Sequence, residues 1–193
     1  MTSKLADAQL IERYRAGDAA VVDTLVRAHQ QAVFRLALSI LDDPAEADEA
    51  AQDAFVAALN ALPSFQGESA FTTWLYRITV NVCRGRLRRR RTRQRLKEAL
   101  QALFHIGEDA AHRAEPHPEE AVIQNEREIA LWQGVRALDD RHRLPLVLHY
   151  YQGLATTEIA VILGLSEGTV HSRLHTARRR LRVHLQVSHN EPR

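Results

Sequence analysis

Residues 153–181 constrain the fold more than any other stretch, because their apolar spacing describes two short helices joined by a tight turn. Gly164 suits that turn, and Ser166 is placed to cap the second helix. Two helices joined in this way form a helix-turn-helix, whose second helix can lie in the major groove of DNA. The buried stripe predicted for the second helix consists of Val170, Leu174, Ala177 and Leu181.

The outer face of this second helix carries hydrogen-bond donors followed by arginines. Between Glu167 and Leu181 there is no further acidic residue. Such a surface is typical of a helix that reads DNA, although a merely solvated basic face has the same composition. The candidate DNA contacts are Thr169, His171, Ser172, Arg173, His175, Thr176, Arg178 and Arg179.

The order of motifs in residues 153–181 resembles the C-terminal DNA-binding domain of bacterial sigma factors. That family has G-L-S-x-x-E-I-A, L-G-x-S-x-G-T-V and S-R-L-x-R-A-R in succession, and this chain reads GLATTEIA, LGLSEGTV and SRLHTAR. Ala155 replaces the usual capping serine, which costs about 1 kcal/mol of helix stability, so Thr156 is the next candidate cap. The resemblance implies that the outer face reads an upstream promoter element, with base contacts from His171, Ser172, His175 and Thr176.

Charge is strongly segregated along a chain whose net charge is only +2. Residues 36–76 contain seven acidic residues and no Lys or Arg, whereas residues 84–97 contain nine basic residues and no acid. An acidic region beside a basic one predicts two kinds of partner, one of them nucleic acid.

Composition also excludes several classes of protein. Cys83 is the only cysteine, and no Cys/His pairs have zinc-ligand spacing, so we expect no disulfide, metal or cofactor. No apolar run reaches about 18 residues and the N-terminus does not resemble a signal peptide, so we expect a cytoplasmic protein without membrane contact of its own. Asp48 and Glu49 diverge by about 100° around a helix, and no His or third acid is placed to converge with them. We therefore expect no catalytic site in this chain.

Apolar spacing predicts helices at about residues 7–14, from Asp18 to Ile40, and from Pro44 onward, with Asp18 and Asp43 as caps. The polar face of the third helix carries early acids, which the helix dipole alone would favour. Its segment ADEAAQDAF resembles A-E-D-x-x-Q-x-x-F, the sigma-factor helix that docks on the coiled-coil clamp of core RNA polymerase. The resemblance implies contacts from Asp48, Glu49, Gln52 and Asp53.

After a loop at residues 63–69, a helical pattern resumes at Phe71. Trp74 shares a face with Phe71 and Ile78, which favours a core position over a base-stacking one. An outward row consists of Arg77, Asn81, Arg84 and Arg88, and such a row can follow a phosphate backbone.

The segment FQGESAFTTWLYRITVNVCRGRLR resembles the sigma-factor segment F-x-G-x-S-x-F-x-x-W-L-Y-R-I-x-x-N-x-x-x-D-x-x-R. In the family this segment melts the downstream promoter element and holds its unpaired bases. Gly85 replaces the usual Asp, which leaves open whether the helix ends there. The implied DNA contacts are Phe65, Gln66, Gly67, Glu68, Ser69, Arg77, Asn81, Arg84 and Arg88.

Residues 93–118 are predicted to be a flexible linker, because they include Pro116 and Pro118 and few apolar residues after Phe104. A helix through Leu100 and Phe104 ahead of the flexible part is also compatible with the sequence. They would separate an N-terminal domain at 1–92 from a C-terminal domain at 119–187. In the resembled family the connector threads toward the polymerase active centre, and a simple tether is equally compatible with the sequence.

These features predict an all-α protein with two small helical domains joined by a flexible linker, the C-terminal one containing a helix-turn-helix. The chain resembles an extracytoplasmic-function (ECF) sigma factor of the minimal two-domain type. The resemblance implies three partners: core RNA polymerase, promoter DNA as duplex and as melted non-template strand, and an anti-sigma factor. The alternative is a stand-alone helix-turn-helix regulator, but residues 1–90 show no βα alternation for a ligand or receiver domain.

Overall fold

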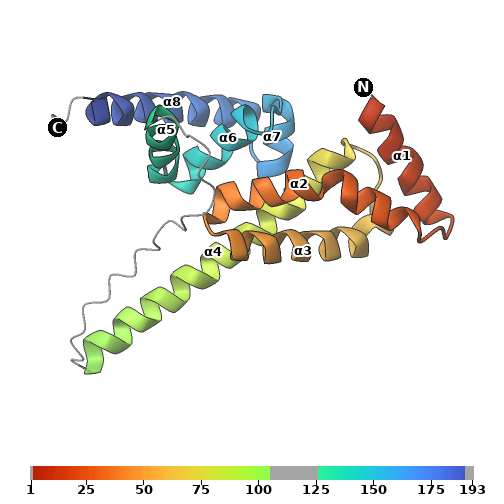
Figure 1. The fold of residues 1–193 in the computed structure, drawn as a ribbon, viewed down its shortest axis with the longest axis horizontal. Coiled ribbons are helices and arrows are strands. Elements are labelled where there is room, and N and C mark those ends of the chain that lie inside the picture. Colours follow the sequence, from red (N-terminus) through yellow and green to blue (C-terminus); the bar gives the residue numbers. More distant parts are fainter. Residues whose placement is uncertain (1, 105–125, 190–193) are drawn as a thin grey trace.

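The computed structural model describes residues 2–104 and 126–189, and these ranges contain α-helices, one 3₁₀ turn and no strand. The predicted all-α class is therefore confirmed (Figure 1). The helices are α1 (Thr2–Arg15), α2 (Val21–Leu41), α3 (Pro44–Ala61), α4 (Phe71–Phe104), α5 (Glu126–Ala137), α6 (Asp140–Tyr150), α7 (Thr156–Leu163) and α8 (Glu167–His189), with the 3₁₀ turn η1 at Leu62–Ser64.

Two of the predicted helix starts have different outcomes. Asp43 caps α3 as expected: its carboxylate accepts a hydrogen bond from the Glu46 amide at 2.9 Å, and Pro44 is the first helical residue. The prediction that Asp18 caps α2 is wrong, because the N-cap is Ala20. Asp18 instead accepts from the Ala20 amide and pairs with Arg13, so its carboxylate stabilises the turn before the helix.

Gly85 does not end its helix, because α4 runs from Phe71 to Phe104. A single glycine costs only about 1 kcal/mol in a helix interior, and the Arg, Gln, Leu, Lys and Ala residues that follow are good helix formers. The predicted linker at 93–118 thus begins as helix, and residues 105–118 lie outside the described ranges. The second half of α4 projects away from the other helices (Figure 1).

The core joins the N-terminal helices to the C-terminal ones. One apolar cluster lies within the first half of the chain, around Val33 and Leu75. A second cluster is shared, since Leu36 and Val80 belong to the same buried group as Ile159. The thiol of Cys83 is part of this shared cluster, and burial raises its pKa to about 12, so it behaves as an apolar core side chain. The described helices include none long and apolar enough to span a bilayer.

Several hydrogen bonds cross between the two halves of the fold, among them the one that Arg91 Nη2 donates to Asp140 Oδ2 at 2.8 Å. The Tyr76 hydroxyl donates to Gln152 Oε1 at 3.2 Å, and the Thr73 hydroxyl donates to Glu158 Oε1 at 3.3 Å. Arg143 Nη2 donates to the carbonyl oxygen of Ile40 at 2.9 Å. Helix α7 therefore packs directly on α4, a contact that the prediction of two linked domains did not include.

Candidate nucleic-acid interface

Helices α7 and α8 form the predicted helix-turn-helix. Gly164 ends α7 in the left-handed region at φ +65°, which a residue with a side chain adopts only with strain. Ser166 caps α8, because its hydroxyl accepts a hydrogen bond from the Thr169 amide at 3.3 Å. The predicted stripe is inside, since Val170 and Leu174 are at most 1% exposed.

The start of α7 keeps half of the usual capping box. Ala155 has no side-chain acceptor, but the Glu158 carboxylate still accepts from the Ala155 amide at 3.0 Å. Thr156 does not cap the helix as predicted. Its hydroxyl donates to Glu167 Oε1 at 2.8 Å, so it ties the start of α7 to the start of α8.

The candidate reading face of α8 is open to solvent over most of its length. His175 and Arg179 are exposed and have no hydrogen-bond or ion-pair partner in the described part of the chain. Arg178 is held in place, because its Nε donates to the Tyr150 hydroxyl at 2.7 Å and its guanidinium lies over the Tyr150 ring. The exposed candidates are His171, Ser172, His175, Arg178 and Arg179, and the half-buried ones are Thr169, Arg173 and Thr176.

The four candidate docking residues of α3 lie together on its exposed face. Gln52 donates to the Asp48 carboxylate at 2.9 Å. Arg86 of α4 reaches across to Glu49 at 2.8 Å and to Asp53 at 2.5 Å. These hydrogen bonds raise the pKa of the Arg86 guanidinium, Asp53 contributing first and Glu49 second. The acidic face is therefore partly neutralised by a residue that sequence analysis did not single out.

The loop before α4 is anchored by an aromatic cluster. The Phe65 ring lies 4.9 Å from the Trp74 ring and 6.0 Å from the Phe71 ring, measured between centroids. Trp74 is half-buried in this cluster, which agrees with the predicted core position. Arg15 also donates to the Phe65 carbonyl. Within residues 65–69, Gln66, Gly67 and Glu68 are exposed and Ser69 is half-buried, with Gly67 in the left-handed region at φ +76°.

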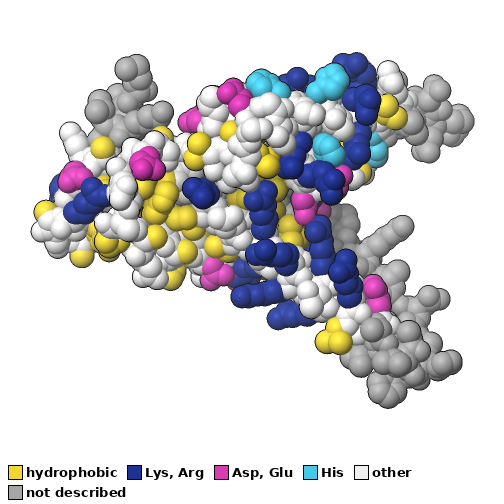
Figure 2. Space-filling view, turned by 180° about the vertical axis from the view of Figure 1, so that it is seen from behind, with side chains coloured by type: hydrophobic (Ala, Val, Ile, Leu, Met, Phe, Trp, Pro, Cys, Tyr) yellow, Lys and Arg dark blue, Asp and Glu magenta, His cyan; other side chains and the backbone are white. Residues whose placement is uncertain are grey.

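The outward row of α4 lies beside the helix-turn-helix. Arg77, Asn81 and Arg88 are exposed, whereas Arg84 is half-buried. Burial lowers the pKa of the Arg84 guanidinium, and the positive charge of Arg173 on α8 adds to this shift. Figure 2 shows the resulting band of Lys and Arg side chains, which continues from the C-terminal helices onto the projecting part of α4.

A cavity of about 450 Å³ lies between α3 and α4, and Asn81 is one of its lining residues. Its other walls come from α3 and α4, including Asp53, Ile78 and Gly85. No loop residue at 65–69 lines this cavity. The loop and Asn81 therefore present two separate places at which a nucleic acid can be contacted.

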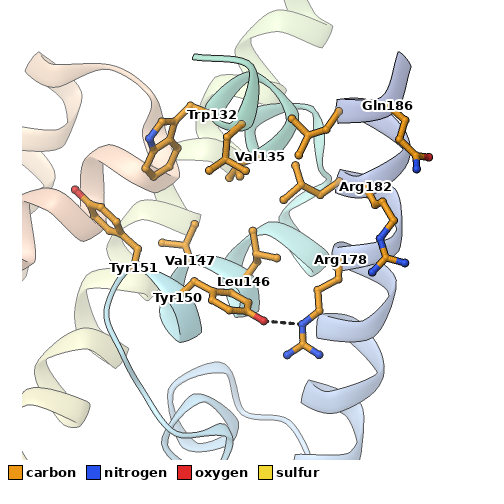
Figure 3. Close-up of a pocket in the computed structure, with 12 residues that line it drawn as sticks. Trp132, Val135, Leu146, Val147, Tyr150, Tyr151, Arg178, Arg182 and Gln186 are labelled. Atoms are coloured by element: carbon orange, nitrogen blue, oxygen red, sulfur yellow. Dashed lines mark hydrogen bonds between the residues drawn. The ribbon is translucent and has the colours of Figure 1, made fainter. Parts of the chain in front are cut away.

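A third surface is an apolar groove of about 760 Å³ between α5, α6 and α8 (Figure 3). Trp132 and Tyr151 meet edge to face at 5.5 Å on one side, and Arg178 and Arg182 lie on the α8 side. The adjacent aromatic residues Tyr150 and Tyr151 are the sequence feature that could have indicated this groove, and the sequence analysis did not consider them.

Among the described residues no cluster of His, Cys, Asp and Glu is arranged to hold a metal.

Comparisons with known proteins identify the two halves of the chain. Residues 25–93 match the family model of sigma-70 region 2, and residues 135–183 match sigma-70 region 4. The chain is 36% identical over 188 residues to the RNA polymerase sigma-H factor of Pseudomonas aeruginosa, covering 96% of this chain and 97% of that protein. It is 34% identical to the ECF RNA polymerase sigma-E factor of Escherichia coli K12, covering 92% and 93%.

A solved structure has the same arrangement of helices. The sigma factor RpoE in complex with the anti-sigma factor NepR from Bartonella quintana matches with a TM-score of 0.63, covering 86% of this chain and 96% of that one. At 21% identity this likeness shows the fold alone. The two relatives exceed 30% identity over nearly the whole chain, and this chain itself matches both sigma-70 regions in order. The chain belongs to the ECF family of RNA polymerase sigma factors.

Proposed function

We propose that this chain binds core RNA polymerase, directs it to specific promoters and helps to open the DNA, in a stress or envelope response. One observation carries the proposal: an acid-bearing region 2 helix and a helix-turn-helix with an open reading face occur on one chain of the ECF family. A stand-alone regulator would not require the region 2 match at residues 25–93. Sigma factors are not enzymes, and the polymerase supplies the chemistry.

Core polymerase is proposed to dock on α3 through Asp48, Glu49, Gln52 and Asp53. All four side chains are exposed, and three of them carry negative charge that suits a basic partner surface. Arg86 already forms ion pairs with Glu49 and Asp53, so the partner must displace Arg86 or share these carboxylates with it.

Promoter DNA is proposed to contact both domains, an N-terminal one at 1–92 and a C-terminal one at 119–187, joined by a linker at 93–118. The outer face of α8 reads the upstream element as duplex. The loop at 65–69 holds the melted non-template strand of the downstream element, and the outward row of α4 holds its phosphates. Because Phe65 is packed against Trp74, its role is to position the loop, and Gln66 to Ser69 meet the base.

We also propose an anti-sigma factor as a regulatory partner, acting in the cytoplasm. The support is that the matching RpoE structure contains one. Affinity purification of the tagged full-length chain from its native cell tests both protein partners together. Core polymerase subunits should be recovered in one complex and the anti-sigma factor in another that lacks polymerase. Recovery of the chain without polymerase subunits in any fraction would refute the proposed function.

Reversing charge on α3 should weaken polymerase binding. The double substitution Glu49→Lys with Gln52→Ala places a positive charge against a basic partner, and we expect roughly a tenfold or greater loss of affinity for core polymerase. Helix content should not change, since both side chains are exposed. Quantitative pull-down with purified core polymerase measures the effect.

A matched control is Glu12→Lys, which makes the same charge change and also breaks an exposed ion pair, that with Arg15 on α1. This control should bind polymerase like the unaltered chain. Equal binding by the control and the α3 variant would mean that α3 is not the docking helix.

The reading face of α8 makes a prediction about sequence preference. His175 is exposed and has no partner in the described part of the chain, so it is free to contact a base edge. His175→Ala should cost about 1–3 kcal/mol at one base position of the upstream element, whereas Arg179→Ala should weaken binding to all sequences alike. Selection from a random duplex library measures both, and an unchanged preference with His175→Ala would remove this residue from the reading set.

A further inference from the structure

The projecting part of α4 is a basic helix with almost no tertiary contact. Leu87 is the last buried side chain on α4 in the described part of the chain, and every side chain from Arg88 to Glu98 is exposed. We call residues 88–98 the arm. Figure 1 shows this part of α4 leaving the helical body, and Figure 2 shows basic side chains along it.

The basic residues of α4 fall on two faces. On the face toward α3, Arg86 pairs with Glu49 and Asp53, and Arg90 lies 3.7 Å from Glu46. The other face is the outward row already described, whose spacing continues past Arg88 by three and then four residues to Arg91 and Arg95. The complete outward row is Arg77, Asn81, Arg84, Arg88, Arg91 and Arg95.

The outward face of the arm has little acidic compensation within the chain. Arg88 and Arg95 have no ion pair in the described residues. Arg91 pairs with Asp140 of α6 at 2.8 Å, but 64% of the Arg91 side chain is exposed, so this contact exchanges readily with solvent or a ligand. A positive row of this kind is open to an anionic partner.

The arm also lacks the usual sources of helix stability. Like charges four residues apart, such as Arg91 with Arg95 and Arg89 with Arg93, repel one another on a helix surface. Most helices in proteins are stabilised by packing of an apolar face, and the arm packs none. A polyanion laid along the row would remove the repulsion and stabilise the helix.

We propose that Arg91 and Arg95 bind phosphates of duplex DNA and extend the phosphate-binding row of α4 beyond the melted strand. The proposal rests on the proposed function, because the row begins at the residues assigned to the downstream element. Arg77 and Arg95 are 18 residues apart, which is about 27 Å along a helix. Arg91 and Arg95, the two residues assigned to duplex, are four residues apart, about 6 Å along the helix, which is the rise of about two base pairs at 3.4 Å each, so both can reach neighbouring phosphates of one strand.

The test compares two double variants that differ only in the face of the helix. Arg91→Ala with Arg95→Ala removes two charges from the outward row. Arg89→Ala with Arg93→Ala removes the same residue type at the same spacing from the other side of the arm, where neither residue has an ion pair in the described residues. Arg→Ala keeps high helix propensity, so circular dichroism should show folded protein in both cases.

The probe is a random-sequence duplex of about 20 base pairs, titrated with the full-length chain by fluorescence anisotropy between about 50 and 200 mM KCl. The slope of log affinity against log salt is negative, and each lost phosphate contact makes it shallower by about 0.9. We therefore expect the slope of the Arg91/Arg95 variant to be shallower by about two than that of the unaltered chain. Its affinity should fall about tenfold less across this salt range than that of the unaltered chain. The Arg89/Arg93 variant should keep the original slope.

Equal slope losses in the two variants would mean that the arm acts as diffuse charge, and the proposal would be wrong. It would also be wrong if the Arg91/Arg95 variant bound duplex normally but lost core polymerase in the pull-down, since the row would then face protein. The duplex titration contains no polymerase. The duplex titration therefore tests the DNA contacts of Arg91 and Arg95, whereas the pull-down with core polymerase tests the proposed sigma-factor function, and either proposal can fail without the other.

Discussion

Replacing Gln66, Glu68 and Ser69 with alanine should abolish promoter opening and leave binding to the upstream duplex intact. A sigma factor must open DNA with binding energy, because it has no motor of its own. Taking one base out of the stack costs a few kcal/mol, which contacts to the extruded base must return. The loop offers the exposed side chains of Gln66 and Glu68 and the half-buried hydroxyl of Ser69 for this purpose, on a backbone anchored at Phe65. A loss of about 3 kcal/mol would reduce opening more than a hundredfold.

Gly67 is left unchanged in this variant because its φ of +76° would strain any other residue. The measurement is permanganate footprinting of the melted region, beside transcription from duplex and from a pre-melted template. The pre-melted template should restore transcription, since it no longer requires base extrusion. A matched control is Asn60→Ala, an exposed polar side chain near the C-terminus of α3. Normal opening by the triple variant, or failure of the pre-melted template to rescue it, would refute capture at the loop.

Local structure in this protein was predictable where short-range physics decides it. The cap at Asp43 followed from an acidic residue before Pro44, and the buried stripe of α8 followed from its apolar period. Both depend on residues within a few turns of one another. The caps at Asp18 and Thr156 were wrong because each side chain had a second polar group within reach, Arg13 and Glu167 respectively. Propensity does not rank such competing partners.

Contacts between distant segments were not predictable in the same way. Arg86 neutralises part of the α3 face across 33 residues or more, and nothing in its neighbourhood marks it among nine basic residues. Tyr76 and Thr73 of α4 form hydrogen bonds with Gln152 and Glu158, which lie 76 and 85 residues further along the chain. The sequence motifs were enough to locate the candidate sites. Which distant side chains contact those sites could be seen only in the folded structure.

Arg143→Ala should destabilise the protein by about 2–4 kcal/mol. Arg143 is only 9% exposed, and its guanidinium donates to the Ile40 carbonyl at 2.9 Å and to Asp140 at 2.9 Å. Ile40 lies in the last turn of α2, where carbonyl groups lack intrahelical partners and where positive charge is favourable. Arg143 thus caps a helix of the other half of the fold. Its removal leaves a buried carbonyl unpaired and opens a cavity in the junction.

Urea unfolding followed by circular dichroism measures this cost, and Arg136→Ala is the matched control. Arg136 crosses the same junction to Asp42 at 2.8 Å, but 53% of its side chain is exposed, so its loss should cost less than about 1 kcal/mol. Arg143→Met should recover part of the loss by refilling the cavity while leaving the Ile40 carbonyl unpaired. If Arg143→Ala costs no more than Arg136→Ala, the Ile40 carbonyl must find another donor, and the two halves of the fold are not held together by this cap.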